Sequence, residues 1–212
     1  MTNLRARMSE FFRRPYGVGA PLNIHMFLPS RLAHHAKTAA SDPRYFVNRL
    51  RVMTYQIIHP DEPWLTKQAL QAIKSFLAAD MRAFEWGSGK STLWLSRHVG
   101  ELVSVEDDPA WYSRVRTMLD AAGIRNTELR QAEGAAYAAQ IAVFPDEAFD
   151  FVLIDGADRD GCIRAAASKV RRGGWIVLDN ADAGWDCSPL ASYRRIVTSN
   201  GVWQTDIFVR NH

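Results

Sequence analysis

A regular alternation of strand-like and helix-like segments begins near Asp80 and continues almost to the end of the 212-residue chain. Short runs rich in branched and aromatic residues are separated by single helical patterns. Strands joined by single helices form right-handed crossovers, which build a mostly parallel sheet with helices on both faces. The chain is therefore predicted to be an α/β protein with a doubly wound, mostly parallel sheet of six to seven strands.

The expected strands share a short apolar run that ends in turn or polar residues: Met81–Glu85, Leu102–Glu106, Thr127–Arg130, Phe149–Asp155, Trp175–Asp179 and Thr205–Arg210. The expected helices lie between them: Ser91–His98, Pro109–Ala122, Gly134–Ala142, Gly161–Val170 and Leu190–Ser199. In such a sheet, ligands bind beyond the carboxyl ends of the strands, at the point where the strand order reverses. The functional residues are therefore expected directly after the strands.

Residues 1–79 are predicted to form a helical N-terminal extension, and residues 80–212 the sheet domain. Leu4, Met8, Phe11 and Phe12 share one helical face. A second helix is expected from Asp42 to Ile58, and a third ends near Ala79. The extension is expected to be a lid over the substrate pocket or a surface for a homodimer, and the first helix also has the pattern of an interfacial membrane helix.

The charge is unevenly distributed, although the formal net charge is only +3. Residues 1–60 hold nine Lys or Arg and two acids, whereas the rest holds seventeen against twenty-one. A basic segment can face an acidic substrate, an anionic lipid surface, nucleic acid or only water. The basic residues form no known nucleic-acid module. The expected partner is therefore a small molecule, acidic or sugar-like.

Other protein classes conflict with the composition. No apolar run approaches the roughly 20 residues that span a bilayer, and the first residues lack the apolar core of a secretory signal. The two cysteines, Cys162 and Cys187, form no CxxC pair and no zinc framework. Their number is typical of a reducing compartment, so a cytoplasmic protein is expected.

The first strand ends in a glycine-containing loop, which three ligand classes use. The loop reads Glu85-Trp86-Gly87-Ser88-Gly89, followed by Lys90, Ser91 and Thr92. An ATP-binding P-loop requires its first glycine where this chain has Phe84. A dinucleotide fingerprint requires a third glycine where this chain has Thr92. ATP is therefore disfavoured, and an NAD(P)-binding oxidoreductase remains an alternative.

The third ligand is S-adenosylmethionine (SAM), because the loop resembles the E/D-x-G-x-G motif of class I, Rossmann-like SAM-dependent methyltransferases. Phe149–Gly156 and Arg171–Asp179 resemble later motifs of the family in order and spacing. The resemblance implies that Glu106 binds the ribose and that Glu133 receives the adenine amino group. Trp86 would pack on the cofactor or belong to the core. The residues assigned to the cofactor are Glu85, Trp86, Gly87, Ser88, Gly89, Glu106, Asp107, Glu133 and Asp155.

A narrower resemblance concerns Asp155, Asp179 and Asn180, which are similar to the metal ligands of catechol and caffeoyl-CoA O-methyltransferases. Oxygen ligands suit Mg²⁺ or another divalent cation, which would lower the pKa of a substrate oxygen. The chain departs from that group at Asp158, where those enzymes carry a lysine. Asp155 is the candidate catalytic residue, with or without a metal.

The predicted function is methyl transfer from SAM to a small-molecule acceptor, with oxygen as the expected acceptor atom. Motifs for methylating the amino groups of bases or glutamine are absent from the sequence. A catalytically inactive SAM-binding interaction protein is the alternative. The resemblance also implies a closing antiparallel hairpin, of which the residues after Asp179 supply one clear strand and a second that is very short or absent.

Overall fold

The computed structural model describes residues 44–211, so the predicted helix near the N-terminus lies outside the described residues. Leu65–Ser199 and Trp203–His212 form one compact unit, and Asn200–Val202 belong to a second unit with residues up to Trp64. In the second unit, helix α3 (Arg44–Ile58) buries Tyr45 and Ile57. None of the described helices is long and apolar enough to cross a membrane.

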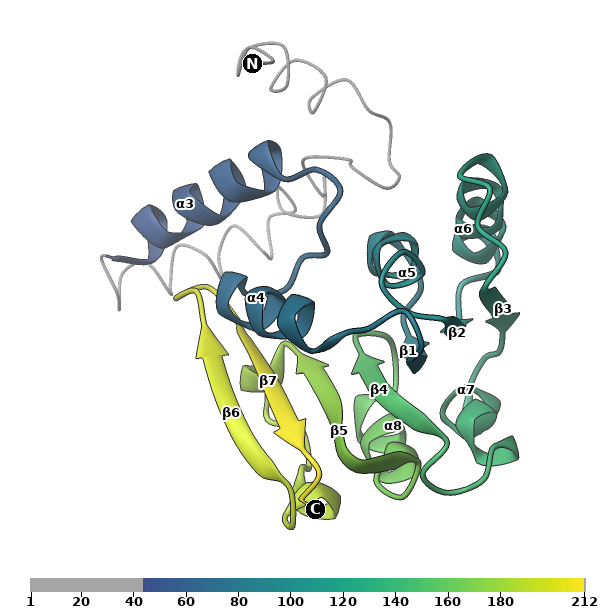
Figure 1. The fold of residues 1–212 in the computed structure, drawn as a ribbon. Helices are drawn as coiled ribbons and strands as arrows, with labels where there is room; N and C mark the ends of the chain where they lie inside the picture. Colours follow the sequence, from purple (N-terminus) through teal and green to yellow (C-terminus); the bar gives the residue numbers. More distant parts are fainter. Residues whose placement is uncertain (1–43, 212) are drawn as a thin grey trace. The chain divides into compact units, whose positions relative to one another are not determined.

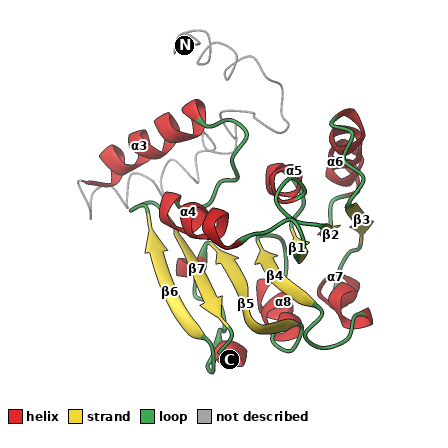
Figure 2. Ribbon diagram, viewed as in Figure 1, coloured by secondary structure: helices red, strands yellow, loops and turns green. Residues whose placement is uncertain are grey.

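A seven-stranded sheet forms the centre of the first unit, as far as the described residues extend (Figures 1 and 2). Its order is β3-β2-β1-β4-β5-β7-β6, with β7 antiparallel to both neighbours and the first five strands parallel. The strands are β1 (Arg82–Trp86), β2 (Glu101–Glu106), β3 (Thr127–Gln131), β4 (Phe149–Ile154), β5 (Val170–Asp179), β6 (Arg194–Ser199) and β7 (Gln204–Val209). The strand order reverses between β1 and β4, so the carboxyl ends of these two strands mark the expected ligand site.

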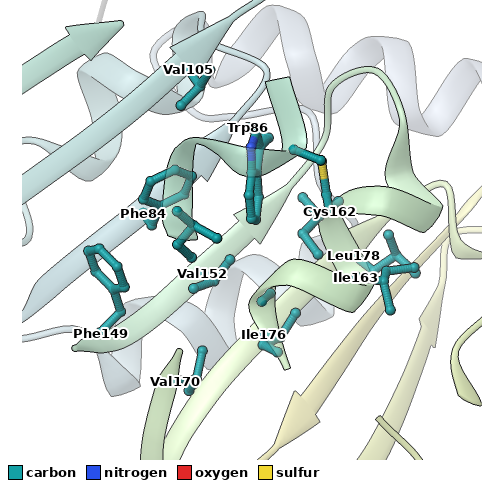
Figure 3. Close-up of a cluster of buried hydrophobic side chains, with 14 of the residues drawn as sticks. Phe84, Trp86, Val105, Phe149, Val152, Cys162, Ile163, Val170, Ile176 and Leu178 are labelled. Carbon is teal, nitrogen blue, oxygen red and sulfur yellow. The ribbon is translucent and has the colours of Figure 1, made fainter. Parts of the chain in front are cut away.

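Helices cover both faces of the sheet because alternate residues of the central strands are apolar on both sides. Ala83 and Phe151 face α4 (Lys67–Phe76) and α5 (Lys90–Leu95). Phe84 and Trp86 face α7 (Ala135–Ala139) and α8 (Arg159–Ala166), in the cluster drawn in Figure 3. The remaining helical segments are α6 (Pro109–Ala121), which packs on β3, and the 3-10 turns η2 (Gln140–Val143), η3 (Ala181–Ala183) and η4 (Ser188–Leu190).

The structure confirms the predicted Rossmann-like fold class, and all six predicted strands are present, with ends shifted by a few residues. The prediction for Leu190–Ser199 was wrong. That segment begins with the turn η4 and continues as strand β6, which pairs with β7 along its full length. The branched run Ile196-Val197-Thr198 favours a strand, and antiparallel pairing with a neighbour satisfies its backbone groups. The closing hairpin is therefore complete.

Helix α4 belongs to the sheet unit, whereas the predicted boundary lay after residue 79. Thr66 is fully buried at the N-cap of α4 and accepts a hydrogen bond from the Ala69 amide. The Thr66 amide also donates to Thr205 Oγ1 on β7, at 3.1 Å. These contacts tie the start of α4 to the sheet, so the compact unit begins at Leu65.

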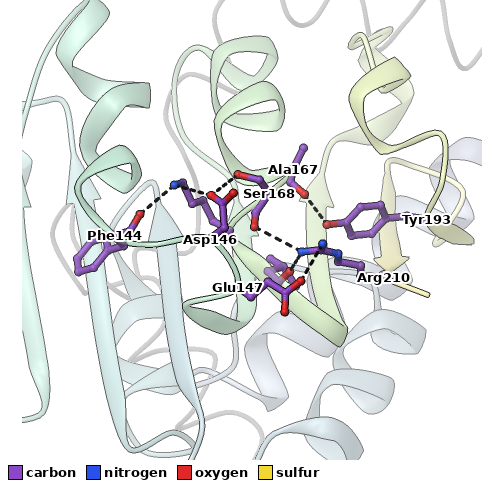
Figure 4. A network of polar contacts seen from close by, with 9 residues as sticks. Phe144, Asp146, Glu147, Ala167, Ser168, Tyr193 and Arg210 are labelled. Atoms are coloured by element: carbon purple, nitrogen blue, oxygen red, sulfur yellow. Dashed lines mark hydrogen bonds and ion pairs between the residues drawn. The ribbon is translucent and has the colours of Figure 1, made fainter. Parts of the chain in front are cut away.

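Polar side chains hold the amino ends of β4 and β5 together (Figure 4). Lys169 Nζ donates to the Phe144 carbonyl and to Asp146 Oδ1, both at 2.9 Å. Arg210 pairs with Glu147 at 3.0 Å, and the Tyr193 hydroxyl donates to the Ala167 carbonyl at 2.7 Å (residues also labelled in Figure 4). Hydrogen bonds and ion pairs thus fix the sheet at the amino ends of β4 and β5. The predicted ligand residues lie at the opposite, carboxyl ends of the parallel strands.

Candidate cofactor and active site

The loops that follow β1 and β4 are in direct backbone contact. Gly87 has φ +91°, and a Cβ there would lie 2.7 Å from the Asp155 carbonyl carbon and the Gly156 nitrogen. A Cβ on Gly156 would lie 1.8 Å from the Tyr137 hydroxyl. The Asp155 amide also donates to the Trp86 carbonyl at 2.9 Å. Glycine is therefore required at both positions, and the two strand ends form one continuous surface at the switch point.

The carboxylate of Glu106 is fixed at the end of β2 by two backbone amides. The Ser88 amide donates to Glu106 Oε2 and the Asp108 amide to Oε1, each at 3.0 Å. Only 5% of the residue is exposed. Burial raises the pKa of Glu106 to about 7, and the two amides oppose this rise. Each oxygen can accept one further hydrogen bond, which is what a ribose diol would donate.

Trp111, on α6, lies against the glycine loop that follows β1. The sequence did not lead us to predict this contact. The Trp111 indole Nε1 donates to the Ser88 carbonyl at 2.7 Å. A Cβ on Gly89 would meet only this indole, at 3.8 Å. The helix start was predicted from Pro109, and Asp108 is its N-cap. An aromatic residue in the first turn after a strand-end acid was the available signal.

Glu85 is buried completely under helix α5 instead of facing an open pocket. Its Oε2 accepts hydrogen bonds from Thr92 and Ser104, both at 2.6 Å, whereas Oε1 is buried without a partner. Thr92 Oγ1 in turn accepts from the Gly89 amide at 2.8 Å. Burial raises the pKa of Glu85 to about 7. Glu85 therefore supports the start of α5 through Thr92, and a single orphaned oxygen is left for a ligand.

Trp86 is a core residue in the structure. Its side chain is fully buried, stacks edge-to-face on Phe84 and donates from Nε1 to the Tyr137 carbonyl at 3.0 Å. The sequence left two alternatives for Trp86, packing on the cofactor or packing in the core, and the structure shows core packing. The assignment of the Trp86 side chain to the cofactor is therefore corrected. The reason is the alternation of β1, which turns Trp86 toward α7.

Glu133 and Asp107 both lie after strands at the same edge of the sheet. Glu133 is exposed and accepts a hydrogen bond from Gln131 Nε2 at 2.8 Å. Beside it, Gly134 has φ +56° and open space where a Cβ would stand. Asp107 is partly buried next to Glu106 and contributes to the raised pKa of that carboxyl group. Their roles toward a cofactor stay predictions.

Asp155, Asp179 and Asn180 are brought together at the ends of β4 and β5, and a fourth residue joins them. Arg159 Nη2 donates to Asp155 Oδ1 at 2.9 Å and to Asn180 Oδ1 at 3.4 Å. Asp179 Oδ1 accepts from Thr205 Oγ1 at 2.6 Å. Burial raises the pKa of both aspartates, and Asp155 raises the pKa of Asp179 further. The sequence reasoning missed Arg159, although an acid and an arginine four residues apart was a visible signal.

This donor set does not fit a divalent cation. A guanidinium already lies on two of the three predicted metal ligands, and it would repel a metal ion at the same oxygens. In the described part of the chain, no group of three or more His, Cys, Asp or Glu side chains is arranged to hold a metal. Asp158, the position at which the sequence departs from the metal-dependent group, is the N-cap of α8.

The SAM residues, in contrast, fit their ligand class. The glycine loop, the held carboxylate of Glu106 and the N-terminus of α5 meet at one strand edge, and Glu85 has an unpaired oxygen there. Thr92 stands where a dinucleotide loop needs glycine, and its hydroxyl is occupied by Glu85 and the Gly89 amide. The strand order and this site define a Rossmann-like fold whose ligand site lies at the switch point of the sheet.

Comparison with known proteins agrees. Residues 84–181 match a family model described as a methyltransferase domain. A search of curated proteins found no match.

Solved structures share the fold at low sequence identity. A methyltransferase-like protein from Silicibacter pomeroyi is 20% identical, with a TM-score of 0.56, over 71% of this chain and 89% of its own. The precorrin-6y C5,15-methyltransferase from Geobacter metallireducens is 21% identical, with a TM-score of 0.53, over 70% and 90%. A SAM-dependent methyltransferase from Aquifex aeolicus is 13% identical, with a TM-score of 0.50, over 73% and 96%. Two further relatives are longer, and the chain spans 48% and 58% of their lengths.

Proposed function

We propose that the chain is an enzyme that transfers a methyl group from SAM to an oxygen atom of a small-molecule acceptor. The observation that carries the cofactor assignment is the carboxylate of Glu106, which the Ser88 and Asp108 amides hold at the end of β2. The basic extension favours an acidic or sugar-like acceptor. A cytoplasmic location and a homodimer through the N-terminal helices remain predictions.

The chemistry that SAM supplies is a methyl group already activated on a sulfonium. The protein's own residues therefore have to bind, orient and exclude water. The Gly87 and Gly156 backbones set the distance between the loops of β1 and β4. Glu106 fixes the ribose, and Glu133 would hold the adenine. Asp155 lies on the same surface, against the glycine loop, where an acceptor would approach.

Titration calorimetry tests the cofactor. The purified protein is titrated with SAM, S-adenosylhomocysteine, NAD⁺ and ATP, together with the variant Glu106→Ala. Binding of the first two ligands is expected, weakened about 10- to 100-fold in the variant, because hydrogen bonds to a charged group contribute about 1.5–3 kcal/mol. Glu101→Gln is the control, since Glu101 is an exposed acid at the other end of β2. Binding of NAD⁺ or ATP alone would contradict the proposal.

Turnover separates an enzyme from a binding protein. S-adenosylhomocysteine is measured with a panel of hydroxylated small molecules, and its formation with an acceptor is the expected result. Cofactor binding without product from any acceptor would favour the inactive SAM-binding interaction protein.

A further inference from the structure

Arg159 is the one arginine of the strand-end cluster, and its surroundings differ from those of a surface ion pair. Its side chain is only 14% exposed. The guanidinium lies over the Trp185 ring, 5.4 Å from the centroid. The Trp185 indole in turn donates to the Asn180 carbonyl at 2.9 Å. A flat cation is thus held between an aromatic face and two oxygen ligands, an arrangement that suits arginine and not lysine.

Two residues next to Arg159, Asp158 in the chain and Asn180 in space, have a left-handed backbone conformation. Asp158 has φ +40° and Asn180 has φ +51°, both in the left-handed region. Such conformations are uncommon outside glycine and are enriched at functional sites. The turn at Asp158 starts α8 so that Arg159 reaches Asp155. The turn at Asn180 presents its side-chain oxygen to the same guanidinium.

One donor of Arg159 is left over. Its Nε–H is buried and has no hydrogen-bond partner in the described structure. A buried unpaired donor is costly, and donors on charged groups are costlier. Asp155, which anchors the arginine, contacts the glycine loop through its backbone. The incompletely paired guanidinium of Arg159 therefore contacts Asp155, whose backbone in turn contacts the glycine loop assigned to the cofactor.

We propose that Arg159 binds an oxyanion of the methyl acceptor, and that it does so in place of a divalent cation. This inference rests on the proposed function and specifies its acceptor: a phenolate or carboxylate oxygen. Guanidinium N–H groups donate strong, charge-assisted hydrogen bonds to such oxygens, and the unpaired Nε–H of Arg159 is the donor available for one. The negative charge would be held next to the sulfonium, where the methyl group is transferred.

The transfer of the methyl group needs neither a metal ion nor a base during the reaction. A lone pair of the acceptor oxyanion forms the new bond to the methyl carbon. The bond between that carbon and sulfur breaks, and its electron pair stays on sulfur, which becomes a neutral thioether. An acceptor that is already ionised releases no proton. The guanidinium holds the oxygen in place and stays protonated throughout.

The first experiment follows the Nε–H resonance of Arg159 by ¹⁵N NMR in the full-length protein saturated with S-adenosylhomocysteine. Benzoate and 4-nitrophenolate are the anionic probes, and benzamide is the neutral match of benzoate. At least one of the two anions should shift the resonance in a saturable way, and which anion does so identifies the oxyanion class. Benzamide should cause no shift. Shifts from all three probes alike, or from none, would overturn the proposal.

Variants and metal binding give independent tests. Arg159→Gln should weaken binding of the effective anion at least ten-fold, whereas Arg164→Gln, at an exposed site on the same helix, should bind it like the native protein. If Arg159→Gln fails to fold, Arg159→Lys replaces it, since the geometry predicts weaker binding there too. Calorimetry with Mn²⁺ should show no binding by the native protein. Stoichiometric Mn²⁺ binding that Asp155→Asn abolishes would refute the inference.

The two proposals fail differently. Absence of S-adenosylhomocysteine binding would refute the proposed function before any probe is added. Binding of S-adenosylhomocysteine together with a metal at Asp155 would refute only the role of Arg159.

Discussion

The buried carboxyl group of Glu85 makes the stability of the sheet domain depend on pH, and glutamine at this position removes that dependence. Burial raises its pKa from 4.5 to about 7, although neighbouring hydroxyls donate to it. The folded protein thus keeps a proton that the unfolded chain has released. Stability that is fully present below the unfolded pKa is lost as the pH rises through the folded pKa. At about 1.4 kcal/mol per pH unit, the loss amounts to about 3 kcal/mol.

Urea unfolding of the native protein and Glu85→Gln at about pH 5, 6, 7 and 8 measures this loss. The free energy of unfolding of the variant, relative to that of the native protein, should increase by about 2 to 3 kcal/mol between about pH 5 and pH 8. The amide adds an offset that pH does not change, and other titrating groups cancel in the difference. Glu101→Gln is the control, because that side chain is 71% exposed. A Glu85→Gln difference constant to about 0.5 kcal/mol would refute the reasoning.

Three further predictions concern single contacts. Gly87→Ala should lower the free energy of unfolding by at least about 2 kcal/mol, because the left-handed backbone disfavours alanine and the Cβ meets backbone at 2.7 Å; urea titration checks the loss, and calorimetry the accompanying loss of SAM binding. Phe149→Ala should cost about 3–5 kcal/mol, since it empties a fully buried position 5.3 Å from the Phe84 ring centre, and a much smaller shift in the urea midpoint would contradict this. Tyr193→Phe should cost about 1 kcal/mol through the Ala167 carbonyl, a loss that thermal unfolding should detect without any change in SAM affinity.

The fold followed from local patterns wherever neighbouring segments set the structure. The glycine loop, the helix that starts at Pro109 and five parallel strands depend on residues close in sequence, and their places were predicted. Strand β6 was missed because Leu190, Tyr193 and Val197 have helical spacing. Its actual partner is β7, whose own place depends on pairing with β5 in the sheet. Tertiary pairing overrides such periodicity.

In the site, too, local features were predicted from the sequence and features that depend on tertiary structure were not. The sequence predicted which residues follow the strands, and the structure places them at one edge. It did not predict the direction of Trp86, which depends on strand register, nor the left-handed turn that brings Arg159 onto Asp155. The resemblance of Asp155, Asp179 and Asn180 to a metal triad implied a metal, and the position of Arg159 in three dimensions changed that interpretation.

The interior position of β7 has a consequence for synthesis of the chain. Residues 204–209 are the last of the described strands along the chain, yet they separate β5 from β6. During translation, β6 therefore has no partner and β5 has an open edge until this segment leaves the ribosome. Such late, non-local pairing slows folding and leaves unpaired strand edges exposed to other chains. A stop codon within β7 should accordingly yield an aggregating product instead of a smaller stable domain.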